Sequence, residues 1–433
     1  MSRRRPSQES ASGPPQRPRR KWIAALAVIA SLAAVGLLWP HWSAYRHWIL
    51  GEAAAEELDF KSASEHFRAF AAVYPNSAQG QYKLAQSLRR EGNYREAESQ
   101  IEGCQWVPEL VELEKAMLEV QQYGTNRRAG ELLEKTVQVR HPEERLLLEA
   151  MVQGDRHVMN LEQAGAWLNV WVDHFPEDWV PRLWRAELMM SFKHFKEARA
   201  DYLKLLELRP DRKETYLKLG ELALADSSDY AQAEAYFLHF LEGAPNNSEA
   251  WLGMARCRHG QGQLEEALIA VQKVLQQQPE HGEACLLMAT IAIDEGRYQE
   301  SLEWLAKAER TEADRLKVHY QFAQVLNRLG RHTEAAAHEQ EFKQLREANT
   351  QLEEAVTQVI KNPSDPQRHH DMGVLFVQIG NDKAAERWFL SALHQNRSFT
   401  ASHEALADLY ARRAGSGDSA MAELHRRMAN AGR

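Results

Sequence analysis

The chain has 433 residues, a formal net charge of −8 and 26% charged residues. Such an acidic chain lacks the basic stripe that nucleic-acid binding requires, so we expect no nucleic-acid partner. Its three cysteines, Cys104, Cys257 and Cys285, are too few and too scattered for a disulfide framework or a zinc site, and we expect them to act as small buried hydrophobic residues. Abundant Ala, Leu, Glu and Gln, with Pro and Gly spaced apart, predict an all-α protein.

The N-terminal segment differs in charge from the rest of the chain. Residues 1–21 hold seven basic residues and one acidic residue, and they lack the apolar content that a fold requires. We expect a disordered basic arm at 1–21. The remainder of the chain is correspondingly more acidic.

An apolar run follows this arm. Residues 22–39 read WIAALAVIASLAAVGLLW without a charge, which gives about 27 Å as a helix and nearly spans a hydrocarbon core. Trp22 and Trp39 mark its ends, and Trp42, Tyr45 and Trp48 follow as an interfacial aromatic belt would. We therefore predict a transmembrane signal anchor at residues 22–40. The positive-inside rule places the arm in the cytoplasm and the rest of the chain outside it, in the periplasm if the protein is bacterial.

A cleaved secretory signal peptide is the alternative interpretation of this run. A cut after Gly36, with Ala34 upstream, would fit the small-residue rule for cleavage. The apolar run is longer than a usual signal-peptide core, and no A-x-A motif stands at its end. These features favour the anchor.

The rest of the chain repeats a pattern about every 34 residues. A small residue comes late in a first helix, Gly marks a turn, Ala comes early in a second helix, a large apolar residue follows four positions later, and Pro closes the unit. Two clear copies run from Glu214 to Pro245 and from Glu249 to Pro279. Units begin near Ala44, Ala78, Leu110, Arg145, Trp179, Lys213, Ser248, Gly282, Leu316, Pro366 and Thr400.

Each position has a physical role. Small residues let neighbouring helices approach closely, and proline stops the second helix. The turn glycines end first helices with a positive φ. They stand at Gly92, Gly124, Gly262, Gly296, Gly330 and Gly380.

This pattern resembles the tetratricopeptide repeat family, with the signature W-x2-L-G-x2-Y, then A-x3-F, then P. The layout is similar to that of membrane-anchored bacterial members. The resemblance implies a right-handed superhelical solenoid of about eleven helix-turn-helix units. Such units bury their apolar faces only by stacking on one another.

The periodicity is interrupted once. After Gly330, residues 333–362 continue as one helical pattern, and the next unit starts late. We therefore expect a main solenoid at 44–347, an extended helix and connector at 348–365, and C-terminal units with a capping helix at 366–433.

Chemistry-bearing motifs are weak in this sequence. Common metalloprotease, phosphate-loop and hydrolase motifs are missing, and His369, His370 and Asp371 form the most suggestive cluster. Adjacent histidines point to different faces of a helix, so we expect a structural or surface role for them. We expect no enzymatic activity, no catalytic or metal-binding residues, no cofactor and no small-molecule substrate.

Two surfaces are candidates for binding. Trp167, Trp171, Trp179 and Trp184 cluster at a helix junction, where core packing competes with a partner-binding or glycan-stacking platform. The family resemblance implies that the fifth residue of each first helix faces a concave groove. The fifth residues are Tyr82, Leu183, Leu217, Leu252, Leu286 and Tyr320, and later His370. Flanking positions add Glu187, Glu221, Arg256 and Gln324, with Arg89 and Arg90 on the unit that also holds Tyr82.

The leading hypothesis is a membrane-anchored scaffold that binds peptides or helices of partner proteins in this groove. The groove lacks the Lys and Asn set by which chaperone-binding members hold a terminal carboxylate. Packing of the ladder between units is the competing explanation for its apolar residues. A glycan- or envelope-handling accessory protein or enzyme subunit that uses the Trp-rich region, and a passive structural spacer, are the alternative functions.

Overall fold

The computed structural model describes residues 39–431, except 126–127, 227–228, 312 and 414–415. Every regular element in this part of the chain is a helix, which confirms the all-α prediction. The chain forms two compact units, Met1–Leu118 and Glu119–Arg433. The division falls within the predicted main solenoid, whose own boundaries stay a prediction.

The first unit contains a helix at residues 39–56 and the helices that follow it. Its aromatic residues Trp39, Trp42 and Tyr45 are exposed, whereas Trp48 packs edge-on against Phe67. The other helices are α2 (Phe60–Val73), α3 (Ala78–Glu91), α4 (Tyr94–Glu102) and α5 (Pro108–Tyr123), which extends into the second unit.

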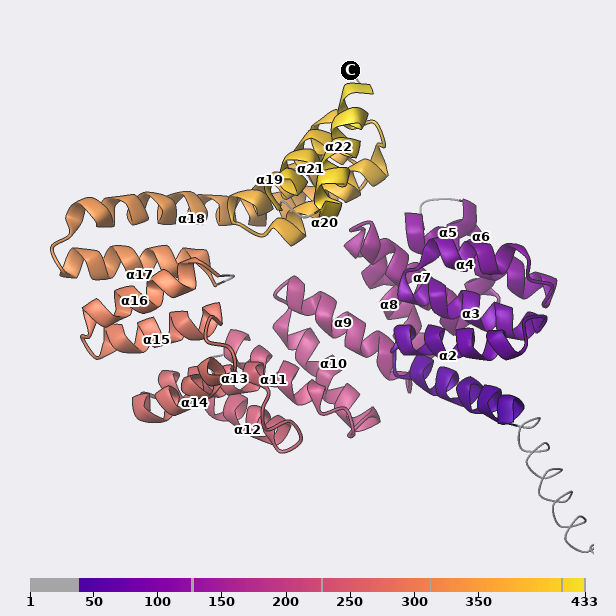
Figure 1. The fold of residues 1–433 in the computed structure, drawn as a ribbon, viewed down its shortest axis with the longest axis horizontal. Coiled ribbons are helices and arrows are strands. Elements are labelled where there is room, and N and C mark those ends of the chain that lie inside the picture. The colour runs from indigo at the N-terminus through magenta and orange to yellow at the C-terminus, as the bar shows by residue number, and fades with distance from the viewer. Residues whose placement is uncertain (1–38, 126–127, 227–228, 312, 414–415, 432–433) are drawn as a thin grey trace, which may run out of the picture. The chain divides into compact units, whose positions relative to one another are not determined.

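The second unit continues the series of antiparallel helix pairs (Figure 1). Its helices are α6 (Arg128–Gln138), α7 (Glu144–His157), α8 (Leu161–His174), α9 (Trp179–Ser191), α10 (Phe195–Leu208), α11 (Glu214–Asp226), α12 (Tyr230–Leu241), α13 (Ser248–Gly260), α14 (Leu264–Gln277), α15 (Gly282–Asp294), α16 (Tyr298–Glu309), α17 (Arg315–Arg328), α18 (His332–Lys361), α19 (Pro366–Gln378), α20 (Asp382–Gln395), α21 (Thr400–Arg413) and α22 (Ser416–Ala431).

These boundaries agree with the predicted repeats. Helices α9, α13 and α19 start at the predicted residues Trp179, Ser248 and Pro366. The long helix expected after Gly330 is α18. All six predicted turn glycines have positive φ, and at the end of α3 the Gly92 N–H donates to carbonyls of the last turn. The predicted right-handed superhelix stays a prediction.

Three turns keep this geometry without glycine. Leu58, Met159 and Lys193 have φ of 63°, 58° and 59°, at the same place in the repeat as the turn glycines. A left-handed backbone costs an L-residue roughly 1–2 kcal/mol. Packing of the flanking helices therefore determines the left-handed backbone of the turn. Glycine only lowers the free-energy cost of that conformation.

The membrane predictions concern a different part of the chain. Within the described residues, no helix has both the length and the apolar character needed to cross a membrane. Residues 1–38, which hold the predicted arm and nearly all of the predicted anchor, lie outside the described residues.

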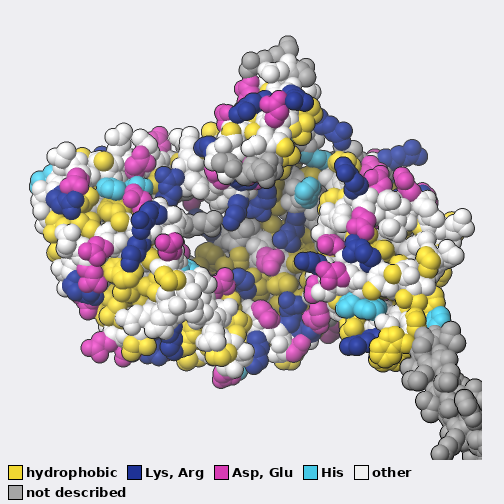
Figure 2. All heavy atoms as spheres, in the orientation of Figure 1, with side chains coloured by type: hydrophobic (Ala, Val, Ile, Leu, Met, Phe, Trp, Pro, Cys, Tyr) yellow, Lys and Arg dark blue, Asp and Glu magenta, His cyan; other side chains and the backbone are white. Residues whose placement is uncertain are grey.

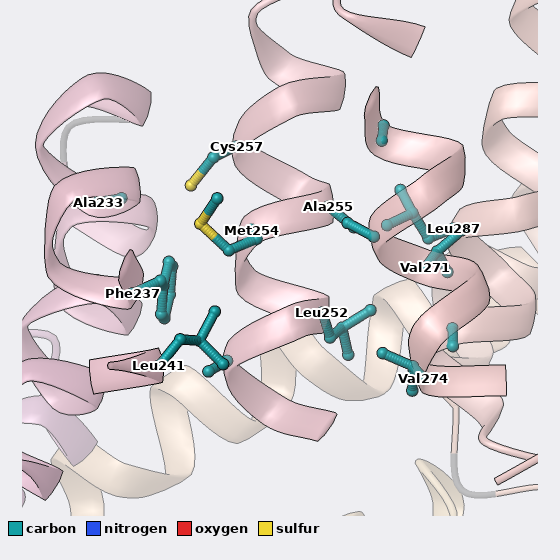
Figure 3. Close-up of a cluster of buried hydrophobic side chains, with 14 of the residues drawn as sticks. Ala233, Phe237, Leu241, Leu252, Met254, Ala255, Cys257, Val271, Val274 and Leu287 are labelled. Carbon is teal, nitrogen blue, oxygen red and sulfur yellow. The ribbon is translucent and has the colours of Figure 1, made fainter. Parts of the chain in front are cut away.

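The core of the second unit is made by contacts between repeats. Figure 3 shows Phe237 and Leu241 of α12 facing α13, while Leu252 on α13 points to Val274 of α14. These buried side chains come from successive repeats, so each repeat completes the core of its neighbour.

Glycines allow this close approach. A Cβ at Gly253 would lie 2.4 Å from Cζ of Phe237, and one at Gly220 would lie 2.6 Å from its Cε1. The Phe237 ring therefore lies between a glycine of its own repeat and a glycine of the next. Gly373 and Phe389 repeat this contact in the C-terminal helices, at 2.4 Å.

The C-terminal helices also contact an earlier repeat of the second unit. The Ser391 hydroxyl on α20 donates to the Val158 carbonyl at the end of α7, with 2.6 Å between the oxygens. Met159 packs on a cluster of Val359, Met372 and Trp388. Residues 366–433 thus belong to the same compact unit as the central repeats.

A buried ion pair lies within the first unit. The Arg89 Nε lies 2.6 Å from Glu114 Oε1, and both side chains are inaccessible to solvent. A buried charge is tolerated only when it is paired. Arg89, which the sequence suggested for the groove, is instead a core residue that joins α3 to α5.

We predict that Gly253→Ala lowers the free energy of unfolding by about 1–3 kcal/mol, because the methyl group meets the Phe237 ring. The matched control is Gly165→Ala on α8, where the nearest atom would be 3.5 Å away. There, alanine should stabilise the helix by about 0.5–1 kcal/mol. Urea denaturation measures the free energy of unfolding of both variants. Equal changes at Gly253 and Gly165 would contradict the packing argument.

Candidate functional site: the inner layer of first helices

The first helices of successive repeats form a layer of their own. Helices α11, α13, α15 and α17 contact one another in order, although a second helix separates each pair along the chain. In a curved stack, the elements that come closest lie on the concave side. We call these first helices the inner layer, and the groove that the family resemblance implies along it stays a prediction.

A pocket of about 530 Å³ opens on this layer. Its apolar wall includes Leu224, Leu252 and Phe237, and charged groups surround it. The full lining is Glu221, Leu224, Ala225, Phe237, Glu249, Leu252, Gly253, Arg256, His281 and Lys317. We call this the α11–α13 pocket.

The structure brings three predicted groove residues together in this pocket: Glu221, Leu252 and Arg256. Arg256 donates to Glu283 of the next repeat at 2.6 Å, and Glu221 accepts from Lys218 at 3.0 Å. Arg256 and Glu221 are thus already paired, but their side chains are 43% and 39% exposed and remain accessible. Exposed pairs of this kind contribute little stability, so they can exchange partners at low cost.

Glu187 and Gln324 lie elsewhere on first helices. Glu187 pairs with Arg156 of the preceding repeat at 3.5 Å, and Gln324 is half-buried on α17. Neither lines the α11–α13 pocket. Their predicted role in binding stays a prediction.

Most of the predicted apolar ladder is core. Tyr82, Leu217, Leu252 and Leu286 are 4–6% exposed, Leu183 is half-buried, and only Tyr320 is freely exposed, at 51%. Packing between repeats, which the sequence left open, explains the four buried positions. Leu217, Leu252 and Leu286 therefore do not form an accessible ladder on this surface.

The Trp-rich junction is also mainly packing. Trp171, Trp179 and Trp184 are buried, and the rings of Trp171 and Trp184 meet edge to face at 5.6 Å between centroids. The Trp171 Nε1 donates to Asp178, the N-cap residue of α9, at 3.0 Å. With three of four rings buried, no broad aromatic platform is available for glycan stacking.

The histidine cluster at the start of α19 has structural partners. Both nitrogens of His369 lie 2.7 Å from a partner, the Ser391 hydroxyl and the Pro363 carbonyl. His370 Nδ1 lies 3.1 Å from the Ser402 hydroxyl. Burial lowers the pKa of both imidazoles, which favours their neutral forms. These contacts fit the structural role that we expect.

The thiols are structural as well. Cys257 and Cys285 are buried and Cys104 is half-buried, and all three are free. Burial raises the pKa of the Cys257 thiol to about 12, so it stays protonated and unreactive.

Sequence reasoning missed a second apolar cavity. This pocket of about 280 Å³ is lined by residues of the α7–α8 turn and the end of α9 together with α18, α19 and α20, including Met159, Phe192, Val356, Met372 and Trp388. Its walls lie some 200 residues apart in the sequence, so repeat periodicity carries no signal for it.

Comparison with known families supports the repeat assignment. Two family models described as tetratricopeptide repeat match the chain, one at residues 50–102 and the other at residues 224–291. These segments hold α3, α12 and α13, whose packing is described above. The chain contains tetratricopeptide repeats. A third model, anaphase-promoting complex, cyclosome, subunit 3, matches residues 260–342.

Solved structures of other proteins are similar in part. PilW, a type IV pilus biogenesis factor, is 20% identical with a TM-score of 0.41, and the match covers 46% of this chain and 93% of that one. A repeat protein from Parabacteroides merdae ATCC 43184 is 16% identical with a TM-score of 0.37, covering 66% and 99%. YrrB, described as having an unusual peptide-binding site, is 16% identical with a TM-score of 0.28, covering 55% and 96%. No curated protein sequence matches the chain.

We predict that Leu252→Ala lowers the free energy of unfolding by about 2–5 kcal/mol, because it opens a cavity between repeats. Tyr320→Ala, at the equivalent but exposed position, should change it by no more than about 1 kcal/mol. Urea denaturation of the two variants tests this. A small effect at Leu252 would show that this side chain is not core.

Proposed function

We propose that the chain is a membrane-anchored scaffold that binds an extended segment or helix of a partner protein along the inner layer of its second unit. The α11–α13 pocket is the observation that carries this proposal, because it combines apolar walls with accessible charges of both signs. An apolar side chain of the partner would enter the pocket, and polar groups beside it would meet Glu221 and Arg256. Tetratricopeptide repeats typically act in this way, as scaffolds for other proteins.

The charge distribution supports a protein partner. On the face shown in Figure 2, Lys and Arg side chains alternate with Asp and Glu, without one large basic area. Nucleic-acid binding requires a basic stripe. A polypeptide with an apolar anchor and charges of both signs is the better match for this surface.

The membrane anchor is part of the proposal and rests on the sequence. The charge-free run at residues 22–39 follows a basic arm, which by the positive-inside rule would hold the N-terminus in the cytoplasm and the repeats outside it. The exposed side chains of Trp39, Trp42 and Tyr45 suit a helix that leaves an interfacial region.

Testing the pocket requires variants that spare the core. Replacing Leu217 or Leu252 with Glu would bury a charge and unfold the repeats, so these substitutions cannot report on a partner. Ala225 is exposed and lines the pocket. Ala225→Arg would fill the pocket from its rim without changing the buried contacts.

We predict that Ala225→Arg reduces partner binding at least tenfold, because the new side chain occupies the space of the apolar anchor. Affinity purification from detergent-solubilised native membranes would identify the bound proteins, and titration of the purified partner would give the affinity. Ala235→Arg, at an exposed position of the second helix α12, is the matched control and should bind normally.

Two results would contradict the proposal. Equal binding by both folded variants would exclude the pocket as the partner site. If neither the variants nor the intact chain retained any partner, a passive spacer would be the better description. Circular dichroism establishes that each variant is folded.

A further inference from the structure

Three successive helices, α16, α17 and α18, bring two histidines and a glutamate together. His319 on α17 and His338 on α18 face each other with their Nδ1 atoms 2.9 Å apart. Glu309, the last residue of α16, adds a carboxylate, and the three donor atoms all lie within 4.8 Å of one another. Among the described residues, this is the one such group of His, Cys, Asp or Glu.

The histidine pair itself recurs in the chain. His47 and His66 have Nδ1 atoms 3.0 Å apart, and His403 and His425 have them 2.9 Å apart. In each case the first histidine is the fourth residue of a predicted unit. Two neutral imidazoles can meet in this way by sharing one N–H···N hydrogen bond. The pairing alone is therefore a packing feature of the repeat.

Glu309 distinguishes the His319–His338 pair from the other two. A carboxylate beside two imidazole nitrogens completes the set of three protein ligands found in many open zinc sites. The residue comes from the preceding repeat, whereas both histidines come from the following one. No other pair in the described part of the chain has such a third donor.

Packing fixes the histidine rings in place. His319 is 7% exposed, and the Phe322 ring stacks on His338 with 4.3 Å between centroids and an interplanar angle of 14°. Glu309 is exposed, which leaves an open side for entry of an ion and for a water ligand. Two imidazoles that packing orients toward each other and one exposed carboxylate suit a site that takes up an ion after folding.

We propose that Glu309, His319 and His338 bind one divalent transition-metal ion, with Zn²⁺ as the preferred ion. Two imidazole nitrogens and one carboxylate oxygen would be the protein ligands, and water would take the fourth position. Zn–N bonds of about 2.0–2.1 Å at a tetrahedral angle place two nitrogens roughly 3.4 Å apart, so the rings must separate by about 0.5 Å. For both Nδ1 atoms to bind the ion, the histidine that carries the Nδ1 proton must take the other tautomer, with its proton on Nε2, so that both rings stay neutral.

Such an ion would join three helices at one point. It would link α16 to both helices of the next repeat, where the regular repeats give way to the long helix α18. Because an ion that binds only the folded state stabilises it, metal binding should raise the unfolding temperature.

The test is a calorimetric titration of the metal-free full chain with Zn²⁺, with Co²⁺ absorption as a second readout. We expect one equivalent to bind and the unfolding temperature to rise. His338→Gln and Glu309→Gln should each weaken binding at least tenfold. His403→Gln, which removes a histidine from a pair without a carboxylate, should leave the affinity unchanged.

Several outcomes would overturn this inference. Binding of no stoichiometric ion would do so, as would unchanged affinity in either ligand variant. An equal loss of affinity in His403→Gln would place the ion elsewhere. Glu309→Gln alters an exposed side chain at a helix end and should fold normally, so the test does not depend on the buried histidines.

Discussion

The structure depends on one close contact, that of an aromatic ring with glycines of two repeats. Phe237 can pack between α11 and α13 only because Gly220 and Gly253 carry no side chain at the points of contact. The ring is then buried by its own repeat and the next one together. A single pair of helices would leave that ring exposed to water, so the repeats are stable only as a stack.

The inner layer follows from this stacking. When rings such as Phe237 and Phe389 lie between helices, the first helices of neighbouring repeats come into contact and their polar faces form a shared surface. Ion pairs between repeats, such as Arg156–Glu187 and Arg256–Glu283, cross that surface. The α11–α13 pocket opens on this surface, and one of its charged residues, Arg256, also links two repeats.

Periodicity predicted the backbone better than it predicted the site. Small residues, turn glycines and prolines act locally, so the sequence placed the start of α13 and the turn at Gly262 correctly. Whether Leu217 and Leu252 are buried depends on how far the next repeat is rotated relative to their own. The position of a residue within its repeat does not specify that rotation. Contacts such as Ser391 with Val158 join distant repeats, and the ion pair of Arg89 with Glu114 needs a partner that the repeat pattern does not specify.

The central functional claim is that a partner lies on the inner layer, over the α11–α13 pocket. Site-specific photo-crosslinking tests it directly, with the probe at Ala225 on the pocket rim or at the exposed Leu238 on the second helix α12. The account predicts a crosslinked partner from position 225 and none from position 238. Crosslinking from position 238 alone would place the partner on the outer helices and contradict the account.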